Sequence, residues 1–129
     1  MKREEYRVPG QAEPISHFTD AVRAGDLLFV SGIVAVDVAG DLVGGDDVVA
    51  QARRVFESMR AVLAAGGCAF EDVVKVTIFL TDVDDRPKIN RVRQEVFGST
   101  RPASSLVEVP RLAVEGAKIE VEAVAVIPS

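Results

Sequence analysis

The segment Lys118–Ile127 constrains the fold more than any other part of the sequence. Every odd-numbered residue in it is apolar, whereas Lys118, Glu120 and Glu122 are charged. A period of two is the period of a β-strand that buries one face. The segment therefore predicts a strand of a larger sheet. The side chains expected to face the core are Ile119, Val121, Ala123, Ala125 and Ile127.

Other segments supply the rest of a sheet and two helices. Apolar residues at spacings of three and four predict a helix over Val48–Ala65, with Asp46 and Asp47 at its start and Gly66-Gly67 at its end. A second helix is expected after Asp84 or Asp85, with Pro87 in its first turn. Further strands are predicted at Phe18–Val22, Leu27–Ser31, Ile33–Val38, Asp72–Leu80 and Ser104–Val109, and residues 1–15 are expected to form a polar N-terminal arm.

This order predicts a single α+β domain over residues 1–129, a mixed six-stranded sheet with both helices on one face. The helices leave the other face open, and Val73, Phe79, Val124 and Val126 are expected to lie on it. Exposed apolar area of this kind is typical of an interface, which favours a homo-oligomer. The alternative is a monomer with scattered surface valines.

Composition excludes several classes of partner. The 15 Lys and Arg residues against 20 Asp and Glu residues give a net charge of −5, which argues against binding nucleic acid or an anionic membrane surface. The longest uncharged apolar-rich run, Leu27–Val36, is about half of the ~20 residues that a membrane-spanning helix needs. No secretory pattern precedes it, and one cysteine makes neither an internal disulfide nor a cysteine-rich zinc site. We therefore expect a cytoplasmic protein without a metal.

Glu120 and Glu122 are the residues that best fit a chemical role. They project from the same face of one strand, about 7 Å apart. If that face is partly buried, one carboxyl has a raised pKa and can hold or activate a water. The alternative is a solvated acidic strand whose charge Lys118 balances. The single histidine, His17, fits a surface turn, and Cys68 follows a helix C-terminus, where a thiol is not activated.

Four segments together resemble the Rid family of reactive intermediate deaminases, also called the YjgF family. They are Asp20–Gly32, Asp72–Asp82, Arg101–Val109 and Lys118–Val126, and the likeness covers about Ser16 to Ile127. The resemblance implies a chorismate-mutase-like fold and a homotrimer with three clefts between neighbouring subunits. It also implies hydrolysis of reactive enamines and imines, such as 2-aminoacrylate, to a 2-keto acid and ammonia without metal or organic cofactor.

The resemblance also implies roles for particular residues. The glutamate that positions the attacking water falls on Glu120. Other cleft positions fall on Ser31, Gly32, Asn90 and the ring of Phe18, which stands where a tyrosine is usual. The arginine that clamps the substrate carboxylate falls on Ser104, and the cysteine two residues later becomes Leu106.

A serine hydroxyl cannot imitate the bidentate fork of an arginine on a carboxylate. Arg101 is three positions from Ser104, which on a regular strand is the opposite face. The sequence thus resembles the arginine-lacking branches of the family, and its substrate is expected to be shifted from 2-iminopropanoate. One hypothesis is a hydrolase of another enamine or imine metabolite, and a second is a trimer that binds a small metabolite without catalysis. An endoribonuclease or translation inhibitor fits the negative charge poorly.

Overall fold

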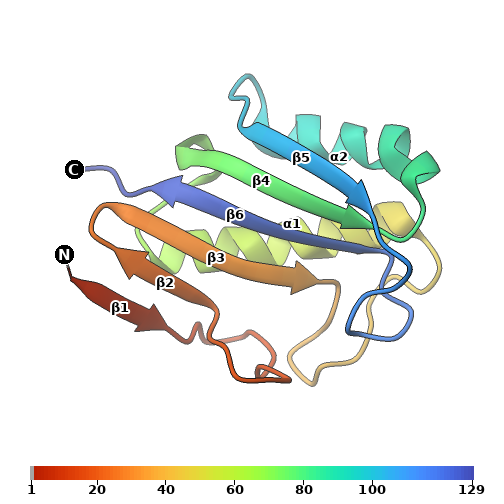
Figure 1. Cartoon of the computed structure of the whole chain (residues 1–129), viewed down its shortest axis with the longest axis horizontal. Helices are drawn as coiled ribbons and strands as arrows, with labels where there is room; N and C mark the ends of the chain where they lie inside the picture. The colour runs from red at the N-terminus through yellow and green to blue at the C-terminus, as the bar shows by residue number, and fades with distance from the viewer. Residues whose placement is uncertain (1) are drawn as a thin grey trace.

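The computed structural model describes residues 2–129 of the chain. Six strands form one sheet in the order β1-β2-β3-β6-β4-β5. The elements are β1 (Arg3–Tyr6), β2 (Ala21–Ala24), β3 (Leu27–Val34), α1 (Val48–Ala65), η1 (Phe70–Asp72), β4 (Val73–Leu80), η2 (Val83–Asp85), α2 (Arg86–Phe97), β5 (Ala103–Glu108) and β6 (Ile119–Val126). Figure 1 looks onto the sheet with α1 behind it.

The sheet is mixed, because β4 and β5 run parallel and every other neighbouring pair is antiparallel. A parallel pair needs a crossover connection, and α2 supplies it between β4 and β5. The strictly alternating strand β6 lies between β3 and β4, in the middle of the sheet. The predicted mixed six-stranded sheet with two helices on one face is therefore confirmed (Figure 1).

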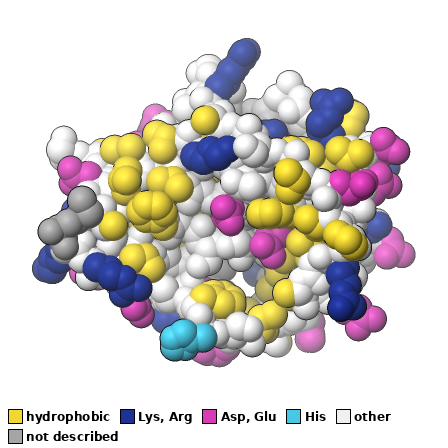
Figure 2. All heavy atoms as spheres, viewed as in Figure 1, with side chains coloured by type: hydrophobic (Ala, Val, Ile, Leu, Met, Phe, Trp, Pro, Cys, Tyr) yellow, Lys and Arg dark blue, Asp and Glu magenta, His cyan; other side chains and the backbone are white. Residues whose placement is uncertain are grey.

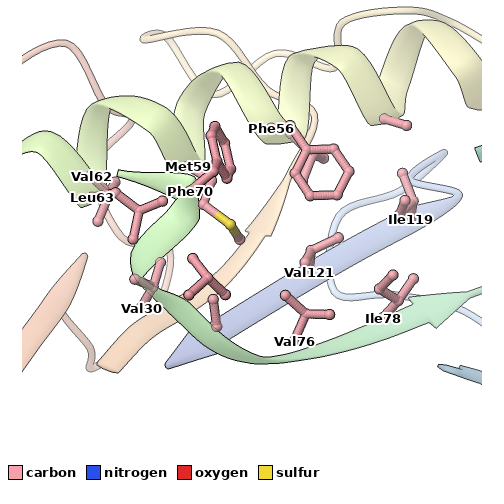
Figure 3. Packing of buried hydrophobic residues seen from close by; sticks show 14 of the residues in the cluster. Val30, Phe56, Met59, Val62, Leu63, Phe70, Val76, Ile78, Ile119 and Val121 are labelled. Carbon is pink, nitrogen blue, oxygen red and sulfur yellow. The ribbon is translucent and has the colours of Figure 1, made fainter. Parts of the chain in front are cut away.

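The core lies between the sheet and the helices (Figure 3). Phe56, Met59 and Leu63 of α1 pack above Ile78 of β4 and Val121 of β6, and all five are buried. The predicted apolar side of β6 is the buried one, since Ile119, Val121, Ala123 and Ala125 are each at most 4% exposed. The opposite side of β6, which carries both glutamates, therefore faces away from the helices.

Local signals in the sequence set the ends of α1 as predicted. The carboxylate of Asp47 accepts hydrogen bonds from the backbone amides of Val49 and Ala50 at 2.9 and 3.2 Å. At the other end Gly67 has φ +80°, a conformation that glycine adopts without strain. Helix α1 consequently begins and ends where its periodicity begins and ends.

Two predicted elements differ from the structure at the N-terminal end. Strand β1 lies inside the expected polar arm and pairs with β2, although its first three side chains are exposed. A solvent-exposed edge strand need not alternate polar and apolar residues, so the sequence gives no sign of β1. The predicted strand Leu27–Ser31 and the first two residues of the predicted strand Ile33–Val38 form one strand, β3, with a register shift between Val30 and Ile33. The rest of the second predicted strand is not strand, apart from an isolated bridge between Val36 and Leu42.

The side-chain facing at the start of β4 was also predicted wrongly. Val73 is 2% exposed and lies in the core, whereas Val74 is 45% exposed on the open face. The register of β4 against β6 shifts between Val73 and Lys75, and an extra residue of this kind reverses the facing of the residues before it. From Val76 onward the alternation follows the prediction, with Val76, Ile78 and Leu80 buried.

Candidate functional site

A cavity of about 430 Å³ opens where the N-terminal segment passes β3 and the start of β6. Four of the predicted site residues line it, namely Phe18, Ser31, Gly32 and Glu120. Pro14, Ile15 and Ser16 cover one side, and Ala113 and Val114 cover another. The cavity therefore combines apolar walls with three acidic residues, Glu13, Asp20 and Glu120, and with serine hydroxyls, which suits a small, partly apolar ligand.

Glu120 lies directly over Gly32 of β3. A Cβ atom placed on Gly32 would be 2.5 Å from Oε2 of Glu120 and 2.9 Å from its Cδ. Real Cβ atoms essentially never approach so closely, so only glycine leaves room for the carboxylate in this position. Gly32 thereby fixes where the acid of the cavity can lie.

The pKa of Glu120 is raised, first by burial of the carboxyl and second by the charge of Glu122. Among residues 2–129 no cation lies within ion-pairing distance of Glu120, and Lys118 does not balance it. The reading of this strand as a solvated edge neutralised by Lys118 is thus not supported. A carboxyl with increased proton affinity at the wall of a cavity can take a proton from water and return it.

The start of β6 is anchored by a buried side chain that the sequence did not single out. The amide of Gln51 donates to the carbonyls of Gly45 and Gly116 at 2.7 and 3.1 Å, and it accepts from the amide of Lys118 at 2.8 Å. Gln51 is fully buried in α1. It therefore ties the loop before β6 to the helix, two residues before Glu120.

Ser31 is less free than the sequence suggests. Its hydroxyl donates to the carbonyl of Thr19 at 2.6 Å, and its amide donates to the carbonyl of Asp20 at 3.0 Å. The Ser31 N–H is therefore already used within the chain and is not free to contact a ligand. The hydroxyl oxygen keeps its capacity to accept a hydrogen bond from a ligand.

The remaining predicted residues, Asn90, Ser104 and Leu106, lie on the other side of the sheet. Ser104 and Leu106 of β5 stand beside Val76 and Ile78 of β4, whose side chains are buried under the helices. Asn90 is exposed on α2. The predicted site residues therefore fall into two separate groups on one chain, which we name the cavity half-site, around Glu120, and the α2–β5 half-site, around Ser104.

The α2–β5 half-site contains an arginine that the sequence reading missed. Nη2 of Arg93 donates to the hydroxyl oxygen of Ser104 at 2.9 Å. Arg93 follows Asn90 by three residues, so the two side chains share one face of α2. That spacing was the only signal in the sequence. Arg101, by contrast, precedes β5 and is exposed.

The open face of the sheet is partly apolar. Its exposed large side chains are Leu27, Phe29, Val74, Val107 and Val126. Figure 2 views this face and shows hydrophobic side chains gathered in two areas with acidic side chains between them. Val73 does not belong to this surface, as described above.

Residues 2–129 contain no group of three or more His, Cys, Asp and Glu side chains placed to hold a metal ion. His17 is exposed, and Cys68 is buried with a thiol pKa raised mainly by that burial. No helix in the described part of the chain is long and apolar enough to cross a membrane.

Comparison with known proteins identifies the family of the chain. A family model described as "Endoribonuclease L-PSP" matches residues 10–127. A crystal structure of a Rid family protein of unknown function, YyfA from Yersinia pestis, superposes with a TM-score of 0.91 at 30% identity, covering 98% of this chain and all of the other. The chain belongs to the Rid family. Its fold is accordingly the chorismate-mutase-like fold that the resemblance implied.

Relatives of this Rid protein include named deaminases. RutC family protein PH0854 of Pyrococcus horikoshii is 41% identical over 114 residues, 88% of this chain and 89% of the relative. A protein named 2-iminobutanoate/2-iminopropanoate deaminase, from Dermatophagoides farinae, is 35% identical over 119 residues, 92% of each chain. Imine deamination is therefore an activity found in the family.

Proposed function

We propose that this Rid protein is a cofactor-independent hydrolase of a reactive imine or enamine, with Glu120 as the group that holds and activates the water. The single observation that carries the proposal is the half-buried carboxyl of Glu120 at the cavity wall, whose pKa is raised by burial and by Glu122. The deaminase name of a relative supports the reaction class.

The reaction needs one group that moves protons twice. Glu120 takes a proton from water as the water oxygen adds to the carbon of the C=N bond, and it delivers that proton to the nitrogen, which gives a neutral carbinolamine. Glu120 then takes the hydroxyl proton of the carbinolamine and delivers it to the nitrogen as the C–N bond breaks, so that a carbonyl compound and ammonia leave. A carboxyl with a raised pKa suits both steps because it is a stronger base than an ordinary glutamate and still an acid.

We further propose that three chains form a ring in which each cleft combines two half-sites. Glu120 projects from the open face, whereas Ser104 and Leu106 face α2, so one chain alone cannot bring them around one ligand. The exposed apolar residues of the open face favour covering by a second copy. A head-to-tail interface repeated three times closes a ring and joins the cavity half-site of one chain to the α2–β5 half-site of its neighbour.

The substrate differs from 2-iminopropanoate in this proposal. Ser104 occupies the position where the family resemblance implies a clamping arginine, and Leu106 and Phe18 make the cleft more apolar. A neutral serine hydroxyl cannot make the two charge-assisted hydrogen bonds with which an arginine holds the carboxylate of a short 2-imino acid. We therefore expect slow turnover of 2-aminoacrylate and faster turnover of an imine with more apolar surface.

The test is hydrolysis of a panel of imines, with 2-aminoacrylate generated in situ as one member, by wild-type protein and by Glu120→Gln. We expect at least about a 100-fold loss in Glu120→Gln, the usual effect of removing a general base. Glu71→Gln changes an exposed acid in η1, after the C-terminal end of α1, and is the matched control that should keep the wild-type rate. Equal measurable rates for wild-type and Glu120→Gln would remove Glu120 from the mechanism. No hydrolysis of any imine by the wild-type protein would favour the second candidate, a trimer that binds a metabolite without catalysis.

A further inference from the structure

The guanidinium of Arg93 contacts a neutral hydroxyl and no carboxylate. Arg3, Arg7, Arg53 and Arg54 form ion pairs, whereas the other arginines of residues 2–129, Arg93 among them, do not. Arg93 is partly buried, and within residues 2–129 no carboxylate lies within ion-pairing distance of it. Its one side-chain hydrogen bond goes to the neutral hydroxyl of Ser104, at 2.9 Å.

This arrangement leaves a charge that lacks its counterion. Burial lowers the pKa of the Arg93 guanidinium, because the charged form loses contact with water and no acid compensates. An arginine nevertheless stays protonated at neutral pH. A guanidinium that is partly desolvated and bonded to a neutral acceptor can gain more from an anion than a fully solvated one can.

The position of Arg93 places that charge in the α2–β5 half-site. Asn90 lies one turn earlier on the same face of α2, and Leu106 follows Ser104 on the same face of β5. The guanidinium has five N–H donors, of which the Ser104 contact uses one. Ser104 thus orients the group while the other donors remain for a ligand.

We propose that Arg93 binds a carboxylate of the substrate, so that the substrate of this protein is an imine or enamine that carries an acidic group. This inference rests on the proposed function and names the substrate class of the same cleft. In this proposal the cation that binds the carboxylate is Arg93 of α2, whereas the family resemblance implies an arginine at position 104 of β5. The cleft therefore keeps an anion-binding group although residue 104 is a serine.

The test measures binding, so it does not depend on turnover. Calorimetric titration compares 2-oxobutanoate with the uncharged 2-oxobutanamide, two product-like ligands of nearly equal shape, in wild-type protein and Arg93→Gln. We expect Arg93→Gln to weaken 2-oxobutanoate at least about tenfold, or about 1.4 kcal/mol, and to leave 2-oxobutanamide unchanged. Arg91→Gln removes the same charge from an exposed position of α2 and should change neither affinity.

Two further variants separate binding from structure. Arg93→Lys keeps the charge and loses the two-pronged hydrogen-bonding geometry of the guanidinium. Its affinity for 2-oxobutanoate should therefore lie between those of wild-type and Arg93→Gln, and its affinity for 2-oxobutanamide should not change. Ser104→Ala removes only the orienting contact and should weaken the carboxylate less than Arg93→Gln does. The inference is overturned if wild-type binds no 2-oxobutanoate, if Arg93→Gln matches Arg91→Gln, or if both ligands weaken equally. A loss of carboxylate binding in a protein that hydrolyses no imine would refute the proposed function while supporting the role of Arg93.

Discussion

Replacing Gly32 by alanine should displace the carboxylate of Glu120 while leaving the glutamate itself unchanged. The added Cβ would be 2.5 Å from Oε2, 2.9 Å from Cδ and 3.2 Å from Cγ of Glu120. Ordinary contacts between such atoms need about 3.5 Å, so the carboxylate has to retreat by about 1 Å. A displacement of about 1 Å at a reacting group costs about 100-fold in rate, equivalent to about 2.7 kcal/mol of activation free energy.

The same substitution should leave the stability of the protein nearly unchanged. The clash is with the far end of a flexible side chain, and Gly32 does not have the positive φ that would strain an alanine. Alanine also lowers the entropy of the unfolded chain, which contributes about 0.4–1 kcal/mol in favour of folding. We therefore expect the free energy of unfolding to stay within about 1 kcal/mol of wild-type.

The assay is kcat for imine hydrolysis, measured beside urea denaturation. Adding Gly32→Ala to Glu120→Gln is the control, because a substitution that acts only through Glu120 costs nothing more once Glu120 is gone. Gly32→Ala with wild-type kcat would refute the placement of the Glu120 carboxylate as the working acid. An equal loss in both backgrounds would mean that the alanine acts elsewhere.

Three other predictions concern stability and assembly. The pKa of Glu120 is raised in the folded chain, so ionisation of this carboxyl destabilises the fold, and Glu120→Gln should have a higher melting temperature than wild-type at neutral pH. The difference in melting temperature should vanish below the ordinary glutamate pKa of about 4.3, and a difference that does not change with pH would contradict the burial of this carboxyl. Gln51→Leu leaves buried backbone groups without partners and should lower the free energy of unfolding by at least about 2 kcal/mol in urea, whereas the exposed Gln94→Leu should not; equal values would contradict the anchoring of β6. Phe29→Asp on the open face should reduce the mass seen by light scattering toward the 13.8 kDa of one chain, while Val38→Asp, exposed outside the sheet, should not; an unchanged mass in Phe29→Asp would refute an interface at that position.

Much of the fold was predictable because its signals are local. Helix α1 has a clear 3.6-residue period and a capping aspartate, and β6 has a clear period of two. Strand β1 was not predicted because an exposed edge strand needs no apolar alternation. The direction of the Val73 side chain was predicted wrongly because the bulge before Lys75 depends on how β4 pairs with β6, which the sequence of β4 alone does not encode.

The candidate site divides in the same way. The pKa of Glu120 is raised first by burial and second by the charge of Glu122. The sequence showed the strand period and the like charge, which are local, and it predicted a raised pKa on condition that this face of the strand is partly buried. Arg93 could not be found so directly, because its contact with Ser104 joins a helix to a strand ten or more residues away. The separation of the predicted residues into two half-sites also depends on the sheet. Glu120 lies on its open face and Ser104 and Leu106 on its helix-covered face, although the family resemblance assigns all three to one cleft.

Complementation between two inactive variants tests the central claim most directly. Glu120→Gln disables the cavity half-site, and Asn90→Ala disables the α2–β5 half-site. If each cleft takes one half-site from each of two neighbouring chains, a ring assembled from an equal mixture contains about one quarter intact clefts. The account predicts about that fraction of wild-type imine hydrolysis in the co-assembled protein. A mixture no more active than its two parents would contradict it.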